Sequence, residues 1–196
     1  MGTPDRYYET ESDIKSGKVH ARNLSQKQKA IFLDRDGTIN KSNGFITKPE
    51  QFELSEGASE AIKKINKSGY LAIVVTNQPV IARGDCTFEE LDLIHAKMET
   101  ELGKEGAFID GIYYCPHHTD KGFPGERAEY KCDCNCRKPK TGLFEMASRD
   151  FNIDLSQSFM IGDSKKDVEA GQKAGCKESF LISDKNTILD CVNKIL

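Results

Sequence analysis

Apolar residues recur along the chain in two alternating patterns, short continuous runs and helical repeats. Residues 30–34 form a short apolar run, and residues 70–78 form a second run rich in β-branched side chains, as expected of strands buried in a sheet. Between them, residues 55–69 place their apolar side chains on one helical face and end at a glycine, which is typical of an amphipathic helix. The pattern predicts a strand, a helix and a second strand.

The same alternation continues to the C-terminus. Thr87 and Glu90 have the spacing of a capping box, and they predict the start of a helix over residues 87–103. The predicted segments that follow are a strand at 111–115, an irregular loop to about 141, a helix near 142–150, a strand at 158–163, a helix near 165–174, a strand at 179–183 and a helix near 186–195. This order predicts an α/β fold, a Rossmann-like three-layer sandwich whose mostly parallel central sheet has helices on both faces.

The composition is that of a globular chain with one core. Its 196 residues suffice for one sizeable domain, with 37% hydrophobic and 30% charged residues of both signs. Residues 1–29 lack a clear period, so we expect a polar extension there and a single domain at 30–196. A net charge of −3 gives no field that favours nucleic acid or an anionic membrane. No apolar run resembles a signal peptide or a membrane span, so we expect a cytoplasmic location.

Polar residues follow four of the predicted strands. They are DRDGT at 34–38, TNQ at 76–78, CPHH at 115–118 and GDSKKD at 162–167. Ligands of open parallel sheets bind at the carboxyl ends of the strands. We therefore expect these distant segments to meet at one edge of the sheet.

The acid pair Asp34 and Asp36 is the first candidate site. At positions i and i+2 of an extended chain both carboxylates face one side, where they repel each other unless a divalent cation binds. A calcium-binding EF-hand loop is excluded, because it needs a glycine at its sixth position and a glutamate at its twelfth; here Gly37 is fourth and Phe45 twelfth. A solvated surface turn stays open as the alternative.

A cluster of cysteine and histidine residues in the long loop is the second candidate site. Two thiols one residue apart do not readily form a disulfide, whereas Cys and His in two short clusters are typical of a structural zinc site, here ordering a loop over 115–136. The selected ligands are Cys115, His117, Cys134 and Cys136. His118 and Cys132 are alternative ligands, and uncoordinated thiols are the alternative interpretation.

With Thr76, Lys138 and Asp163 added, the acid pair resembles the four-part signature of the haloacid dehalogenase (HAD) superfamily of phosphohydrolases over about residues 30–185. The resemblance implies that Asp34 attacks phosphorus to form an aspartyl-phosphate, while Asp36 transfers protons. It also implies that Thr76 and Lys138 hold the phosphoryl oxygens.

The same resemblance implies a catalytic magnesium ion held by Asp34, by the carbonyl of Asp36 and by Asp163. Gly37 would let the backbone bend tightly beneath the phosphate. Asp167 would support the metal site through hydrogen bonds.

A narrower resemblance comes from FLDRDGTIN, YCPHH and the CRKP segment. They are similar to the D-glycero-D-manno-heptose 1,7-bisphosphate 7-phosphatase family, bacterial enzymes of heptose precursor synthesis that carry this zinc loop. The similarity implies that Arg137 binds the region of the second phosphate and that Asn77, Gln78 and Arg83 lie near the substrate. Two departures from the family pattern are Pro79 in place of a serine and Ser164 in place of a lysine.

The predicted function is magnesium-dependent hydrolysis of the 7-phosphate of this heptose bisphosphate. The alternatives are a histidinol-phosphate phosphatase, another phosphatase of small phosphomonoesters, and a catalytically inactive, zinc-stabilised binding module. The sequence does not decide which anomer is used. We expect a small sugar phosphate as partner, no nucleic acid and no membrane, and a monomer.

Overall fold

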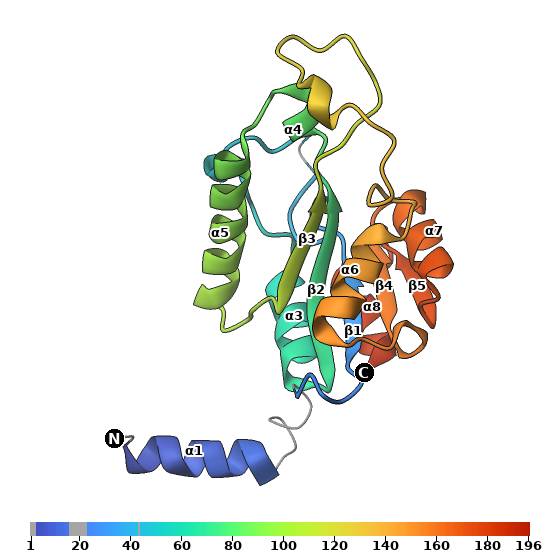
Figure 1. The fold of residues 1–196 in the computed structure, drawn as a ribbon. Coiled ribbons are helices and arrows are strands. Elements are labelled where there is room, and N and C mark those ends of the chain that lie inside the picture. The colour runs from blue at the N-terminus through green and yellow to red at the C-terminus, as the bar shows by residue number, and fades with distance from the viewer. Residues whose placement is uncertain (1–2, 16–22, 43) are drawn as a thin grey trace.

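A five-stranded sheet with the strand order β3-β2-β1-β4-β5 forms the centre of the structure, a computed structural model that describes residues 3–15, 23–42 and 44–196 (Figure 1). The strands are β1 (Lys29–Leu33), β2 (Tyr70–Asn77), β3 (Gly111–Cys115), β4 (Phe159–Gly162) and β5 (Glu178–Leu181). Every pairing between neighbouring strands is parallel. The predicted parallel sheet is confirmed, with β1 at its centre.

Helices cover both faces of the sheet, as predicted. They are α3 (Ala58–Lys67), α4 (Val80–Arg83), α5 (Phe88–Lys104), α6 (Gly142–Phe151), α7 (Lys165–Ala174) and α8 (Ile188–Ile195), with short 3-10 turns at Pro49–Gln51, Ala128–Tyr130 and Leu155–Gln157. Apolar side chains of α3, α5 and α8 form the core on one face, and those of α6 and α7 form the core on the other. Two helical layers therefore enclose the sheet.

The alternation of side chains in β1 explains both cores. Ile31 and Leu33 point to the α3 side, whereas Ala30 and Phe32 point to the α6 side, where the Phe32 and Phe144 rings lie 4.7 Å apart. These four residues of β1 are fully buried. Since successive strand residues face opposite sides, a strand covered on both sides must be apolar throughout, and the polar residues begin only at Asp34.

The capping box predicted from Thr87 and Glu90 is present. The Glu90 backbone N–H donates to Thr87 Oγ1 at 3.1 Å, and the Thr87 N–H donates to Glu90 Oε2 at 2.8 Å. This reciprocal pair satisfies two N–H groups at the start of α5, so the helix begins where the sequence predicts.

The N-terminal segment forms α1 (Pro4–Lys15), in which no residue is buried. The division of the chain into an extension over 1–29 and a domain over 30–196 stays a prediction, and part of that extension lies outside the described residues. In the portion of the chain that the structure describes, no helix combines the length and the apolar character that crossing a bilayer requires.

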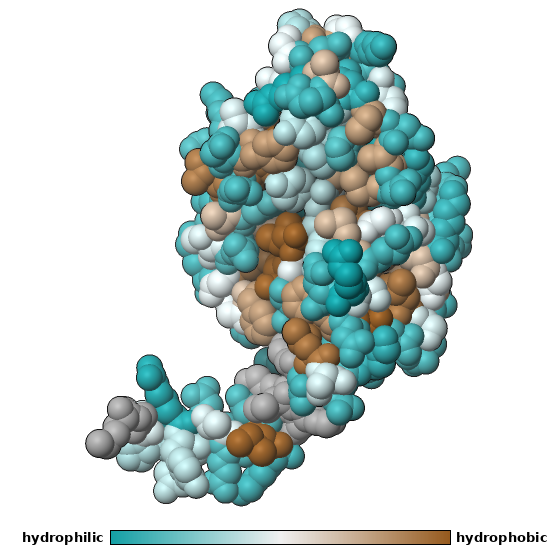
Figure 2. Space-filling view, viewed as in Figure 1, coloured by the Kyte–Doolittle hydropathy of each residue, from teal (hydrophilic) through white to brown (hydrophobic). Residues whose placement is uncertain are grey.

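The surface seen in Figure 2 alternates between hydrophilic and hydrophobic residues. The end of the molecule formed by the loop after β3 is mostly hydrophilic in this view, with few strongly hydrophobic residues. A long loop of this character buries little apolar area and needs another source of order.

Candidate active site

One cavity of about 660 Å³ opens at the carboxyl ends of the strands. Nine of the predicted site residues line it: Asp34, Asp36, Thr76, Asn77, Arg83, Arg137, Lys138, Asp163 and Asp167. They come from the ends of β1, β2 and β4, from α4, from the loop before α6 and from the start of α7. The segments expected at one edge of the sheet therefore meet there.

Lys138 lies between two carboxylates inside this cavity. Its Nζ is 2.9 Å from Asp34 Oδ1 and 2.6 Å from Asp167 Oδ1, and it donates to the Val75 carbonyl at 2.7 Å. Burial lowers the pKa of Lys138, but the two carboxylates outweigh it and raise the pKa above its ordinary value. The buried lysine is thus held in its charged form.

Burial shifts the pKa of Asp34 upward, whereas it shifts the pKa of Lys138 downward. Removal from water raises the pKa of this carboxyl group to about 6, although the nearby Lys138 charge acts to lower it. Asp34 follows the last residue of β1, and its Oδ1 also accepts the Arg35 backbone N–H at 2.8 Å. The side chain is therefore fixed in place, and a cation that enters the cavity would lower the pKa of this carboxyl group.

Asp163 completes an acidic group with Asp34 and Asp167, whose carboxylate oxygens lie within 4.8 Å of one another. Partial removal from water, followed by the charge of Asp167, raises the pKa of Asp163. Three carboxylates beside one lysine leave excess negative charge, and oxygen ligands suit magnesium. The residues present therefore fit a divalent cation.

The two oxygens of Asp167 are already engaged. Oδ1 accepts from Lys138, and Oδ2 accepts both the backbone N–H and the hydroxyl of Ser164, at 2.9 and 2.6 Å. The Ser164 contacts form the capping box of α7. Asp167 thus orients Lys138 and the residues next to Asp163.

Gly37 explains how Asp163 approaches the acid pair so closely. Its backbone has a φ of +78°, and a Cβ atom built on it would lie 2.0 Å from Asp163 Oδ2. Any side chain here would displace the carboxylate. Glycine is required here for two reasons: the turn needs a positive φ, and the Asp163 carboxylate occupies the space that a Cβ atom would fill.

The carboxylate of Asp36 lines the cavity but lies outside the acidic group. It accepts hydrogen bonds from Arg35, from Asn40 Nδ2 at 3.1 Å and from Gln78 Nε2 at 2.8 Å. Gln78 itself does not line the cavity and is only 1% exposed. Gln78 was predicted to lie near the substrate, but in the structure it contacts the side chain of Asp36 instead.

The residues at the end of β2 organise their neighbours. Thr76 Oγ1 accepts from Gln78 Nε2 at 3.0 Å. The Asn77 amide pairs with the backbone of Lys138, donating to its carbonyl at 3.1 Å and accepting its N–H at 3.0 Å. Asn77 therefore fixes the chain segment that carries the buried lysine.

Two arginines, Arg83 and Arg137, also line the cavity. The Arg83 guanidinium lies 4.4 Å from the centre of the Phe45 ring and 4.3 Å from that of Phe123, while its buried Nε has no hydrogen-bond partner. Arg137 donates to the His117 carbonyl at 2.9 Å. A guanidinium held by stacking or by one hydrogen bond keeps further N–H groups for an anion.

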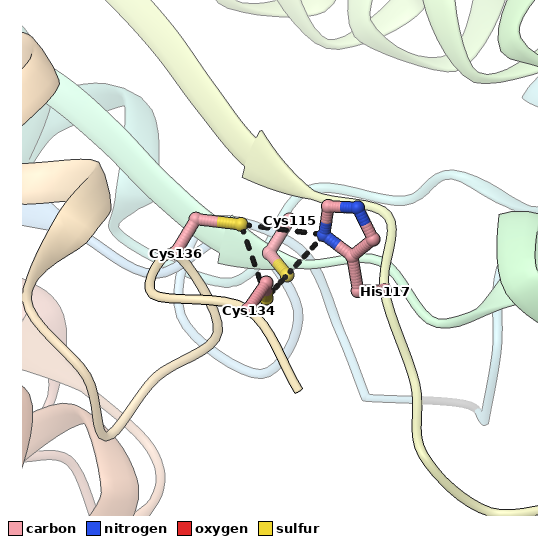
Figure 3. A group of neighbouring side chains, drawn as sticks. All are labelled: Cys115, His117, Cys134 and Cys136. Atoms are coloured by element: carbon pink, nitrogen blue, oxygen red, sulfur yellow. Dashed lines mark hydrogen bonds between the residues drawn. The ribbon is translucent and has the colours of Figure 1, made fainter. Parts of the chain in front are cut away.

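Figure 3 shows the side chains of Cys115, His117, Cys134 and Cys136 pointing toward one another. The sulfur atoms of Cys134 and Cys136 are 3.3 Å apart, and those of Cys115 and Cys134 are 3.5 Å apart. His117 Nδ1 lies 3.4 Å from the sulfur of Cys136. These are the four residues selected from the sequence, and three thiols with one imidazole fit a tetrahedral zinc ion.

The alternative ligands lie elsewhere. Cys132 is exposed, and His118 lines the cavity with its Nε2 3.4 Å from Asp120. Hydrogen bonds from the neighbouring thiols, Cys115 first, lower the pKa of Cys136 to about 5. The cluster therefore presents a thiolate, the form of cysteine that binds metals.

Sequence reasoning missed two residues of this site, Arg35 and His95. Arg35 is fully buried, and its guanidinium contacts both the Asp36 carboxylate and His95 Nε2. A charged residue inside a motif that ends an apolar strand could have indicated a buried ion pair. His95 gave no comparable signal, because it occupies an ordinary core position of α5.

Comparison with known proteins places the chain among phosphatases. Residues 135–188 match the HAD-hydrolase-like family model. The chain is 42% identical over 156 residues to the D-glycero-beta-D-manno-heptose-1,7-bisphosphate 7-phosphatase of Haemophilus ducreyi, covering 79% of this chain and 83% of that protein. It is 41% identical over 163 residues to the Pasteurella multocida protein of the same name, covering 83% and 86%.

A solved structure gives the same picture. The D,D-heptose 1,7-bisphosphate phosphatase from B. bronchiseptica, complexed with magnesium and phosphate, superposes with a TM-score of 0.73 at 28% identity, covering 86% of this chain and 98% of that one. The resemblances stated from the sequence are confirmed.

Proposed function

Because this chain belongs to the family of D-glycero-β-D-manno-heptose-1,7-bisphosphate 7-phosphatases, we propose that it hydrolyses the 7-phosphate of this sugar bisphosphate, using magnesium. The observation that carries the proposal is the group of Asp34, Lys138 and Asp163 in one cavity beside Asp36. The relatives' names support the β anomer, which the sequence alone left open.

The first step is attack on phosphorus. Asp34, fixed by Lys138 and by the Arg35 N–H, forms a bond from its carboxylate oxygen to phosphorus. The bond from phosphorus to the sugar oxygen breaks, and Asp36 gives a proton to the departing alkoxide. The products of this step are the sugar 1-phosphate and an aspartyl-phosphate.

The second step regenerates the enzyme. Asp36, now a carboxylate, takes a proton from water as the water attacks the aspartyl-phosphate, and inorganic phosphate leaves. Thr76 and Lys138 hold the phosphoryl oxygens in both steps, since phosphoryl transfer depends mainly on positioning and on charge stabilisation.

A magnesium ion would be held by Asp34, the Asp36 carbonyl and Asp163, and it would neutralise charge so that the anionic nucleophile and substrate can approach. The complex of the B. bronchiseptica protein with magnesium and phosphate supports magnesium as the metal. Gly37 keeps the space that Asp163 needs.

We assign a structural role to zinc in the four-residue cluster of Cys115, His117, Cys134 and Cys136. All four positions would be occupied by protein, which leaves none for a reacting water. The Arg137 side chain is bonded to the His117 carbonyl. Ordering this loop would therefore place Arg137, together with Arg83, to bind the phosphate that is not cleaved.

Thiol ligands for zinc and seven cysteines, all free in this structure, suit a reducing compartment. We therefore propose a cytoplasmic location. We also propose that the chain acts as a monomer, since every residue used in the mechanism comes from one copy.

The test compares phosphate release from both anomers of the heptose bisphosphate, from histidinol phosphate and from a 3′-phosphorylated oligonucleotide. We expect the highest kcat/KM for the β anomer in the presence of magnesium. The D34N variant serves as the control, and it should fold with the wild-type circular dichroism spectrum yet release no phosphate. If the heptose is hydrolysed no faster than histidinol phosphate, the substrate assignment is wrong.

A further inference from the structure

Arg35 carries a full positive charge in a place that water does not reach. Its side chain is 0% exposed, although it sits between the two aspartates of the site. A buried charge is strongly unfavourable unless a partner of opposite sign and hydrogen bonds compensate it. The two-step mechanism above gives this guanidinium no task.

The partner of Arg35 is the carboxylate of Asp36. Nη2 donates to Oδ1 at 3.0 Å and to Oδ2 at 2.9 Å, and Nε donates to Oδ1 at 3.1 Å. A fork of this kind fixes the plane of a carboxylate, which a single point charge cannot do. The Asp36 side chain keeps 28% exposure, so the carboxylate is held by Arg35 while still lining the cavity.

The far side of the guanidinium is held in turn by two side chains from other elements. Nη1 lies 3.3 Å from His95 Nε2 on α5, and Nη2 donates to Gln78 Oε1 at 3.1 Å. Burial, and then the Arg35 charge, lower the pKa of His95 to about 4. The ring is neutral, and because arginine only donates hydrogen bonds, Nε2 must be the acceptor.

Gln78 closes the arrangement, because its Nε2 donates to Asp36 Oδ2 at 2.8 Å. One amide thus contacts both the guanidinium and the carboxylate. Asn40 Nδ2 adds a further donor to Oδ1. The orientation of Asp36 is therefore fixed by a network that reaches from the end of β1 to the middle of α5.

We propose that Arg35, held by His95 and Gln78, is a positioning residue that fixes the Asp36 side chain, which in its protonated form gives its proton to the leaving oxygen and becomes the carboxylate. The inference rests on the proposed function, because it concerns the proton donor of the same reaction. The proposal also gives His95 a role, although His95 does not line the cavity: it holds Arg35 in place.

A purely structural role for Arg35 predicts a different outcome. Loss of packing or fold would lower turnover of every phosphate ester by a similar factor. Loss of proton donation instead depends on the leaving group, since an alkoxide needs a proton whereas 4-nitrophenolate departs without one. The ratio of the two effects separates the roles.

The experiment measures kcat/KM for the heptose bisphosphate and for 4-nitrophenyl phosphate with wild type, R35K and R149K. Because kcat/KM covers only the steps through departure of the leaving group, later water attack does not enter. R35K keeps the charge but loses the fork, and we expect about a 10²-fold loss on the sugar phosphate, the lower end of typical proton-transfer effects. The loss on 4-nitrophenyl phosphate should be far smaller. R149K, the same change at an exposed arginine, should alter neither.

A second pair of variants, H95Q and H95L, tests the proposal even if R35K does not fold. H95Q keeps a hydrogen-bond acceptor for Nη1 and should retain the wild-type ratio of the two rates, whereas H95L should lower the rate on the sugar phosphate selectively. Equal losses on both substrates in R35K and H95L would overturn the positioning role and leave the proposed function standing. Wild-type protein that hydrolyses neither ester would overturn both.

Discussion

Lys138 Nζ and Asp34 Oδ1 lie 2.9 Å apart in the interior of the cavity, with the lysine side chain only 2% exposed. The two charges hold each other in a place where neither would be stable alone. The same ammonium group also contacts Asp167. One lysine therefore neutralises part of the acidic site.

Replacing this lysine should cost both activity and stability. For Lys138→Met we expect kcat/KM to fall by about 10²–10³-fold, as for the loss of one donor to transition-state charge. The melting temperature should also fall, because two buried carboxylates lose their cation. Lys140→Met is the matched control, since Lys140 is an exposed lysine two residues away that pairs with Asp133. A loss below about tenfold in Lys138→Met would contradict the role given to this lysine.

The raised pKa of Asp34 predicts how stability depends on pH in metal-free protein. The folded-state value of about 6 lies above the ordinary value of 3.8, so the folded protein binds a proton that the unfolded chain has released between these two values. The favourable contribution is complete below about pH 4 and is lost as the pH rises through about 6. The amide introduced by D34N mimics the protonated side chain at every pH.

The measurement is the free energy of unfolding in urea for wild type and D34N, with a chelator present. We expect wild type to lose stability relative to D34N between about pH 4 and about pH 6, and the difference to be constant above about pH 7. A difference that does not change with pH would show that the burial of Asp34 does not disfavour its charged form.

Gly37 provides a test of how the acidic group is assembled. Alanine at this position would bring its Cβ to 2.0 Å from Asp163 Oδ2, so G37A should raise the magnesium concentration needed for half-maximal activity. Gly175 is the control, because its φ of +83° imposes the same backbone strain while a Cβ atom there would meet no other atom within 4 Å. Gly175→Ala should lose about 1–2 kcal/mol of stability from the backbone strain, G37A should lose at least as much, and only G37A should change the magnesium requirement. Equal magnesium requirements would exclude the steric explanation.

The cysteine cluster predicts which thiols matter for zinc. C134S should lower bound zinc, measured by atomic absorption, from one ion per chain toward none, and should make the loop over 115–136 sensitive to protease, because zinc binding supplies about 10–16 kcal/mol of apparent free energy. The KM for the bisphosphate should rise as Arg137 loses its support. C132S changes an exposed thiol of the same loop and should bind zinc like wild type. Zinc loss in C132S instead would reassign the ligand set.

Much of the secondary structure could be predicted, because helices and strands follow from the pattern of nearby residues. Helix α7 covers Lys165–Ala174, the range predicted from the sequence, and α5 begins at the predicted capping box. The strand order could not be read from these patterns, since it depends on which strands pair across long distances. Helix α4, a single turn at Val80–Arg83, was also missed, because four residues carry no period.

The site could be predicted in part for a similar reason. Residues of one motif, such as Asp34 and Asp36, or Cys134 and Cys136, are neighbours in the chain and reach the same region, although the Asp36 carboxylate lies outside the acidic group. The partnership of Arg35 with His95 joins residues 60 positions apart. Nothing in the spacing shows such a contact until the sheet and α5 are packed together.

The cluster at Cys115 and Cys136 also fastens both ends of the same polar stretch at a single point. Within that stretch Phe123 stacks on Arg83, whereas the aspartates belong to the sheet edge beneath. Insertions or replacements between the fastened ends can thus change the loop around Phe123 at little cost in loop closure. Such an arrangement would let this loop vary in length and composition while Asp34, Asp36 and Asp163 keep their positions at the sheet edge.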